Sequence, residues 1–263
     1  MRHYWKILVY LFKQNFIRDL QFRSDFWLSV LTQLSWFGMQ VLLFRLFYNQ
    51  TAAINGWDFY QAIVLLGVFT LLEMVLFTFF MHNLSRMPYY ISDGGLDFLL
   101  LKPVDAQFFV SFRYLSTNSI FQILPALLLL FIGLRELGVS PSGGQILLFA
   151  LAALSSLVIL YSLWFITVIS LFWINKVFEI HELFLSLFHF VKYPANVYQG
   201  AVRQFFSFVF PILFMITVPA QIVLNRLENI RTLLALPFIA VVTLLAARLI
   251  WRAGLRRYAS ASS

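Results

Sequence analysis

The chain contains no cysteine, and only 11% of its 263 residues are charged. Without cysteine it has no disulfide framework, no zinc–thiolate site and no lipid-modified cysteine. A soluble globular domain carries about 25% charged residues. The low charge content therefore excludes an ordinary soluble domain.

Motifs of soluble enzymes are also missing. The chain has no GxxxxGK[ST] loop for nucleotide phosphates and no GxSxG nucleophile elbow. The pair His181-Glu182 begins as a zinc-protease helix does, but Leu185 stands where the second histidine is required. These absences predict a chain that is not an enzyme, with no catalytic residue, no metal site and no cofactor of its own.

Long apolar runs dominate what is present: 61% of the residues are hydrophobic, and the mean hydropathy is +0.84. A membrane crossing needs about 20 mostly apolar residues to match a hydrocarbon core of about 30 Å. Six segments qualify, at 26–47, 60–81, 108–133, 146–173, 177–197 and 232–251. We expect one all-α integral membrane domain over residues 1–263, with six transmembrane helices. The first long run starts near Phe26 without a small-residue cleavage site, so we expect no cleavable signal peptide.

The basic residues lie beside the ends of these runs and predict the topology. With the N-terminus inside, the inner segments hold Arg2, Lys6, Lys13, Arg18, Arg23, Arg86, Lys102, Arg113, Lys176, Arg248, Arg252, Arg256 and Arg257. The outer segments then hold Arg45, Arg135, Lys192, Arg203, Arg226 and Arg231. This inner excess predicts a multi-pass protein of the inner or plasma membrane with both termini in the cytoplasm. It also accounts for the net charge of +8 without a nucleic-acid partner.

Residues 178–224 are apolar throughout but are interrupted by Pro194, Pro211 and Pro219. Two full crossings here would give seven spans and would place the C-terminal arginines outside. Because proline ends or kinks helices, we interpret 177–197 as a short fifth span. The segment 198–224 is then expected to form re-entrant or interfacial helices on the outer side.

The first 25 residues have a different pattern. One side of the expected helix carries Trp5, Leu8, Val9, Phe12, Phe16 and Leu20, although Ile7, Tyr10 and Leu11 lie on the polar side. This pattern predicts a basic amphipathic helix along the cytoplasmic interface. The alternative is a charged anchor for the first span.

Polar side chains inside the spans are the candidates for a substrate path. Glu73 lies well inside the second span, where a charge is costly. In the first span Ser29, Gln33 and Gln40 recur at helical spacing. These four residues either line a path through the membrane or, as an alternative, hold helices together.

The inner loop at 82–107 carries the segment ISDGGLDFLLLKPV, in which a Gly-Gly turn precedes a short apolar run that Lys102-Pro103 ends. Such a helix at the membrane surface is suited to mechanical contact with a cytoplasmic partner.

With three further elements, this loop resembles the permeases of ABC transporters of the ABC-2 type, in a six-span bacterial and cyanobacterial subgroup. The other elements are the basic helix before the first span, FWINKVFE after the fourth, and the proline-punctuated YPANVYQGAVRQFFSFVFPILFMITVPA before the last. The resemblance covers essentially the whole chain.

The resemblance implies an exporter subunit that pairs with a second permease subunit, identical or related, in membrane lipid. Each permease subunit would contact one of two cytoplasmic ABC ATPase subunits, which bind ATP and Mg. Spans one, two and five would face the substrate path. The ATPase-coupling residues would be Asp93, Gly94, Gly95, Leu96, Asp97, Phe98, Leu99, Leu100, Leu101, Lys102 and Pro103, with Arg18 and Arg23 of the N-terminal helix.

Two other functions compete with the permease. One is a membrane-embedded enzyme that acts on lipids, with Glu73, His82 or His181 as acid or base. The other is a secondary transporter, for which broken helices and inverted repeats are typical. Lipids, hydrophobic drugs, peptides and glycans all fit an aromatic-rich conduit, and the sequence does not choose among them.

Overall fold

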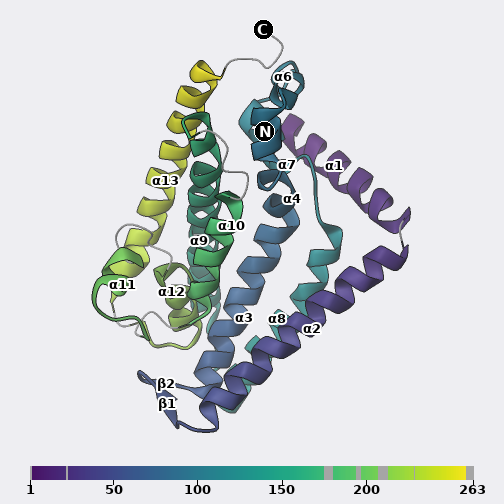
Figure 1. The fold of residues 1–263 in the computed structure, drawn as a ribbon. Helices are drawn as coiled ribbons and strands as arrows, with labels where there is room; N and C mark the ends of the chain where they lie inside the picture. The colour runs from purple at the N-terminus through teal and green to yellow at the C-terminus, as the bar shows by residue number, and fades with distance from the viewer. Residues whose placement is uncertain are drawn as a thin grey trace.

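The structure is a computed structural model that describes residues 2–21, 23–174, 180–193, 197–206, 213–227 and 229–258. In this described part it is helical except for turns and one antiparallel pair of two-residue strands, β1 (Ala53–Ile54) and β2 (Trp57–Asp58). Figure 1 shows an elongated bundle in which both termini and helix α6 lie at one end and the two strands at the other. The shared end of the termini agrees with the topology predicted from charge.

The helices follow one another along the chain with few long loops. Their bounds are α1 (Arg2–Gln21), α2 (Arg23–Tyr48), α3 (Phe59–Leu76), the π-helical η1 (Phe77–Met81), α4 (His82–Leu84), α5 (Met87–Ser92), α6 (Gly95–Leu100), α7 (Ala106–Phe112), η2 (Thr117–Gln122), α8 (Ile123–Glu136), α9 (Gly143–Ile169), η3 (Ser170–Phe172), α10 (Ile180–His189), η4 (Phe190–Lys192), α11 (Gly200–Gln204), α12 (Leu213–Val223) and α13 (Ile230–Arg257).

Five helical stretches among the described residues are long and apolar enough to cross a membrane. They cover Ser24–Tyr48, Phe59–Ser92, Thr117–Glu136, Gly143–Phe172 and Ile230–Arg257. Their positions match the first, fourth and sixth predicted spans closely, whereas the helical stretch of the second predicted span, 60–81, continues to Ser92 into the predicted inner loop. The predicted class, an all-α membrane protein, is confirmed.

The fifth predicted span, 177–197, contains α10 and η4. These two helices have ten and three residues, and together they extend roughly 20 Å at 1.5 Å per residue. That length is shorter than a hydrocarbon core of about 30 Å. Residues 175–179 and 194–196 lie outside the described part, so the count of six spans stays a prediction.

The third predicted span starts too early in the sequence. Helix α7 ends at Phe112, and the spanning helix begins only at Thr117. The side chain of Asn83 explains the break, because its Nδ2 donates to the Tyr114 carbonyl at 2.6 Å and its Oδ1 accepts the Tyr114 N–H at 2.9 Å. The Ser116 N–H also donates to the carbonyl of Thr78, in the π-helical turn η1, at 2.9 Å. These bonds hold 113–116 out of the helix, which hydropathy alone does not reveal.

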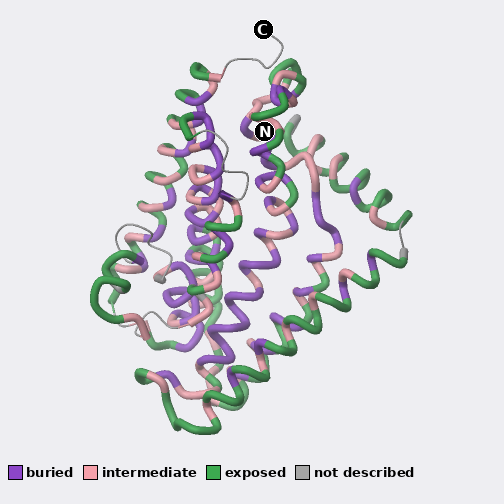
Figure 2. The backbone as a smooth tube through the Cα atoms, in the orientation of Figure 1, coloured by how far each residue is buried: buried purple, intermediate pink, exposed green. Residues whose placement is uncertain are grey.

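Helix α3 lies at the centre of the packing. Leu65, Leu66 and Phe69 have no exposed surface, and α3 packs against α8, α9, α12 and α2. Figure 2 shows the buried backbone following α3 through the molecule. Its crossing with α8 is close, because a Cβ atom on Gly133 would lie 2.5 Å from Val64 Cγ2 and 3.0 Å from the Tyr60 carbonyl oxygen.

Helix α2 lies at the periphery and leaves most of its apolar surface open. Trp27, Leu31 and Leu42 are each about 60% exposed and belong to the long exposed face of α2 in Figure 2. A membrane protein presents such a face to lipid or to another membrane subunit.

Helix α1 covers the segment predicted as interfacial, residues 1–25, and is fixed to the bundle at Asn15. The Asn15 Nδ2 donates to the Arg113 carbonyl at 3.2 Å. Trp5 and Val9, on the predicted apolar side, are 68% and 50% exposed. Ile7 and Leu11, expected on the polar side, are half-buried instead. The predicted apolar side is thus available to lipid, and the location of α1 at the interface stays a prediction.

The segment predicted as re-entrant, 198–224, contains α11 and α12. Helix α12 has eleven residues with Pro219 inside it and extends roughly 16 Å, too short for a crossing. Met215, Ile216 and Ala220 are fully buried, and α12 packs against α9 and α3. Pro194, Pro211 and the rest of 207–212 lie outside the described residues, so re-entry from the outer side stays a prediction.

The close crossing of α3 and α8 generates a stability test with Gly133→Ala and the control Gly38→Ala. The new methyl group at position 133 has no room, and overpacking of this kind costs about 1–3 kcal/mol. Gly38 also lies in an apolar helix, but a methyl group added there would meet no atom within 4 Å. We expect Gly133→Ala to lower the thermal unfolding midpoint in detergent and Gly38→Ala to leave it unchanged or raise it. Equal midpoints for the two variants would contradict the packing of α3 on α8.

Candidate functional site

A cavity of about 600 Å³, to which both polar and large apolar residues contribute, lies between α2, α3 and η2, with His189 of α10 at its wall. Three of the four predicted path residues meet here: Gln33 and Gln40 from α2 and Glu73 from α3. Positions 33 and 40 are two helical turns apart and therefore share one face of α2. The structure thus brings together residues that are 40 positions apart in the sequence, and we call this cavity the α2–α3 groove.

Ser29, the fourth predicted path residue, lines an adjoining cavity of about 290 Å³. The two cavities share His82, Ser116 and Asn118 in their walls. The smaller one also contains Asp19 and Asp25. All four predicted residues therefore lie along one polar surface that runs beside α2.

Several side chains of the α2–α3 groove are buried without full hydrogen bonding. Gln122 Nε2 donates to Gln33 Oε1 at 2.6 Å. The side-chain oxygens of Gln40 and Gln122 accept no hydrogen bond from the described residues, although these residues are only 5% and 7% exposed. An unpartnered buried oxygen is costly in an apolar medium. The groove is therefore suited to water or to a ligand that donates hydrogen bonds.

Glu73 is 5% exposed and forms part of the groove wall. Among the described residues, the cation that interacts with its carboxylate is Lys192 in η4. Lys192 belongs to the segment predicted as the fifth span. Both predicted roles for Glu73, a point on a substrate path and a partner that holds helices together, remain predictions.

The structure brings together two of the three acid–base residues of the competing lipid-acting enzyme. His82 lines the α2–α3 groove with Glu73, but His181 is absent from its wall and its Nε2 lies 3.1 Å from Glu182 Oε1. Within the described residues, no group of three His, Asp or Glu side chains is arranged to hold a metal ion.

The sequence analysis missed eight polar residues of the groove: Thr32, Ser35, Thr70, Ser116, Asn118, Ser119, Gln122 and His189. A signal was available for four of them. Ser116, Asn118, Ser119 and Gln122 belong to the polar run STNSIFQ at 116–122, which interrupts the apolar pattern of the predicted third span.

The predicted coupling segment forms α6, with a buried side and an exposed side. Leu96 and Leu99 are 0% and 2% exposed and hold the helix against the bundle. Phe98 and Leu101 are 73% and 81% exposed, the largest exposed fractions among the large apolar side chains of the described residues. Asp93, Leu100, Lys102 and Pro103 are exposed as well. An exposed apolar surface of this kind, at the end of the molecule that carries both termini (Figure 1), is suited to contact with a partner protein.

The Gly-Gly pair is explained by local geometry. Gly94 precedes α6 with φ of +73°, a left-handed conformation that favours glycine. A Cβ atom on Gly95 would lie 3.1 Å from Tyr90 Cδ1. The two glycines thus permit the sharp turn from α5 into α6.

Two contacts connect the coupling segment to α13. Arg248 forms an ion pair with Asp105, the residue that caps α7 by accepting the Phe108 N–H at 3.0 Å. Burial alone would raise the pKa of Asp105, but hydrogen bonds from Arg248 and the backbone, with the Arg248 charge, hold that pKa below its usual value. At the end of α13, burial and the neighbouring Asp97 carboxylate raise the pKa of Tyr258.

Arg18, predicted to contact the ATPase, lies at the end of α1. Its guanidinium is 2.9 Å from Asp19 and lies over the ring of Tyr114, which Arg86 also contacts. Arg18 therefore packs near the start of α5 rather than on α6. The side chain of Arg23 lies outside the described part.

Five helices in the described part of the chain that are long and apolar enough to cross a membrane, with a groove between two of them, are compatible with a membrane transport component. Residues 34–262 match the family model described as ABC-2 family transporter protein, and the chain belongs to this family of ABC transporter permeases. This family forms the membrane component of the transporter. No curated protein and no solved structure matches the chain significantly.

The α2–α3 groove can be tested with single cysteines, because the natural chain has none. We compare Gln33→Cys, in the groove wall, with its neighbour Leu34→Cys, which is 41% exposed but does not line the groove. Thiols react as thiolates, which form in water and not in lipid. We expect a water-soluble maleimide to label Gln33→Cys at least tenfold faster in membranes. Equal rates would argue against a hydrated groove.

Proposed function

We propose that this chain is the transmembrane subunit of an ATP-driven exporter in the inner or plasma membrane. Two permease subunits, identical or related, form the substrate path, and each contacts a separate cytoplasmic ATPase subunit that binds ATP and Mg. Both termini are cytoplasmic. Membership of the ABC-2 family favours this function over a lipid-acting enzyme or a secondary transporter.

The α2–α3 groove supports the assignment of the substrate path. It draws side chains from the predicted first and second spans and His189 from the fifth, the three expected to face the path, and it also includes Ser119 and Gln122 of the predicted third span. The open apolar face of α2 beside it offers a surface for the second permease subunit. If the substrate path lies between two subunits, each subunit contributes one side of it, and the α2–α3 groove would be that side.

The exposed apolar surface of α6 supports the proposal that the chain contacts an ATPase. Helical structure runs nearly without interruption from Phe59 to Ser92, and α6 follows after the turn at Gly94. Movement of α6 would therefore reach α3, and with it Glu73 in the groove wall. ATP binding would close the two ATPases, draw the two α6 helices together and open an outer gate formed by 198–224. The nucleotide drives this change only through a higher affinity for the closed state.

The exposures of α6 residues determine which substitutions test the contact. An aspartate at Leu99 would disrupt the packing of α6 itself, because Leu99 is buried. Phe98 and Leu101 are exposed, so aspartate at these positions changes the surface and leaves the buried side intact.

We expect the double variant Phe98→Asp/Leu101→Asp to lose the co-purifying ATPase, or its coupling to transport, by at least tenfold. Desolvating a carboxylate in an apolar contact is strongly unfavourable. The measurement is the ratio of ATPase to permease after a mild-detergent pull-down, together with transport-coupled ATP hydrolysis. The matched control, Phe98→Leu/Leu101→Met, keeps the surface apolar and should behave as the natural chain. Unchanged assembly and transport in the aspartate variant would show that α6 is not the coupling helix.

A further inference from the structure

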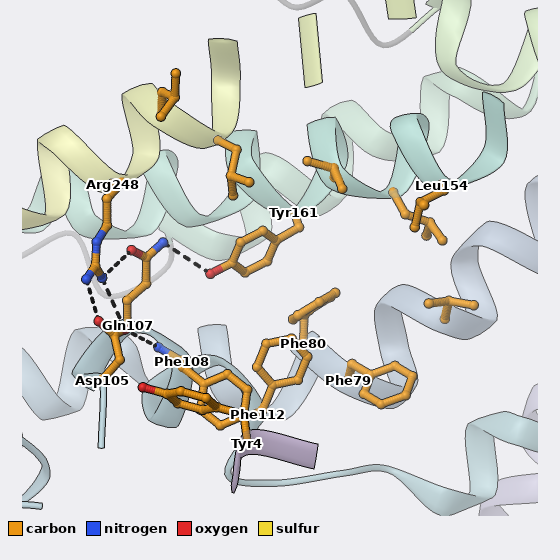
Figure 3. Close-up of a pocket in the computed structure, with 15 residues that line it drawn as sticks. Tyr4, Phe79, Phe80, Asp105, Gln107, Phe108, Phe112, Leu154, Tyr161 and Arg248 are labelled. Atoms are coloured by element: carbon orange, nitrogen blue, oxygen red, sulfur yellow. Dashed lines mark hydrogen bonds and ion pairs between the residues drawn. The ribbon is translucent and has the colours of Figure 1, made fainter. Parts of the chain in front are cut away.

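A second cavity, of about 820 Å³, lies between η1, α7, α9 and α13, and Tyr4 of α1 closes one side of it. Figure 3 shows the residues that line it. It shares no lining residue with the α2–α3 groove. The continuous helix formed by α3 and η1 separates the two cavities. Val75 and Phe79 line this cavity, while Glu73 and Phe77 line the groove.

One end of this cavity is polar. Arg248 donates to Asp105 Oδ1 at 3.1 Å and to Gln107 Oε1 at 3.0 Å. Tyr161 adds its hydroxyl group, which lies 2.8 Å from Ser111 Oγ and accepts from Gln107 Nε2 at 3.4 Å. Figure 3 shows Arg248, Asp105 and Gln107 gathered at this end.

The remainder of the cavity is apolar. Its walls are formed by Val75, Phe79, Phe80, Phe108, Phe112, Leu154, Leu157, Val158, Leu244 and Leu245. Along α9 the distance from Tyr161 to Leu154 is seven residues, or roughly 10 Å at 1.5 Å per residue. The cavity therefore extends from a charged end into an apolar channel about as long as half of an acyl chain.

The orientation of the cavity matches one leaflet of the bilayer. Arg248 lies nearer the end of α13 that carries the C-terminus, and Asp105 precedes α7 close to α6. The apolar end is formed by residues nearer the middle of α9 and α13. A phospholipid in the leaflet beside α6 has the same arrangement, with its phosphate at the surface and its chains toward the centre.

The cavity is also open to the lipid. Leu154 and Leu245, on the neighbouring helices α9 and α13, are 59% and 58% exposed, and both helices are long enough to cross the membrane. Water is poorly held by walls of this composition, since a buried water needs two to four polar partners. An acyl chain meets no such requirement.

We propose that this cavity binds a membrane phospholipid, with one acyl chain in the apolar channel and the phosphate at Arg248. A guanidinium has five N–H donors, and three of them donate to Asp105 and Gln107. The other two donors, on a side chain that is 34% exposed, are available to a phosphate oxygen. The bound lipid contacts η1 and the Asp105–Arg248 pair, and so lies beside the connection between α6 and α13. It is a resident lipid, separate from the groove proposed for substrate.

The test uses the full chain reconstituted in vesicles that contain phosphatidylglycerol with a diazirine in one acyl chain. After photolysis, labelled peptides are mapped by mass spectrometry. We expect the peptides that contain Phe79, Phe112 and Val158 to carry at least fivefold more label than the peptide of α8, whose Leu124 and Phe131 are 66% and 62% exposed and do not line the cavity. Labelling in proportion to lipid exposure alone would overturn the proposal.

Two double variants test the shape of the cavity. Leu154→Trp/Leu245→Trp fills it from the wall formed by α9 and α13 and should lower the label at Phe79 at least tenfold. The control Leu147→Trp/Leu249→Trp changes leucines of the same two helices that are 62% and 64% exposed and do not line the cavity. Because all four leucines are exposed, neither variant disturbs the core. Equal labelling of the two variants would contradict the site.

The role of the phosphate is tested by competition. Unlabelled phosphatidylglycerol should displace the probe at least tenfold more effectively than diacylglycerol with the same chains, which lacks the phosphate. Equal displacement would overturn the assignment of the phosphate to Arg248. None of these measurements uses ATP hydrolysis or transport, so their outcome is independent of the proposed exporter function.

Discussion

The burial of α3 among α2, α8, α9 and α12 is the packing constraint on which the rest of the structure depends. The side chains of Leu65, Leu66 and Phe69 in α3 have no exposed surface, and Gly133 allows α8 to approach the α3 backbone closely. A packed interior of this density moves as a unit or changes between discrete arrangements, but it does not deform continuously. The helical line from Phe59 to Ser92 therefore connects the middle of the membrane with the end of the molecule that carries α6.

The two faces of the helical stretch from Phe59 to Ser92 carry different kinds of side chain. One face presents Glu73 to the α2–α3 groove, and the other presents Val75 and Phe79 to the apolar cavity. The ion pair between Asp105 and Arg248 lies at the end of that apolar cavity and also fixes the loop after α6 to α13. A contact made at α6 would thus affect both sides of α3, at the proposed substrate path and at the proposed lipid site.

Much of the fold could be predicted from the sequence because the lengths of apolar runs determine which segments can cross a bilayer. The start of the third spanning helix could not, since Asn83 and Thr78 break the helix through hydrogen bonds to Tyr114 and Ser116. The spacing of Gln33 and Gln40 correctly predicts that both lie on one face of α2. Only the fold shows that Gln122 donates a hydrogen bond to Gln33. The sequence did not reveal the apolar cavity, because its walls belong to ordinary apolar spans. Arg248 was considered only as one of the basic residues that predict the topology.

The central claim is that this chain works as the membrane subunit of an ATPase-driven transporter. The most direct measurement is the native mass of the complex isolated in mild detergent through a tag on the natural chain. We expect two permease subunits, this chain with itself or with a related chain, bound to two subunits that carry a nucleotide-binding motif. A stable chain that is isolated without any ATPase, under conditions that preserve such complexes, would contradict the account.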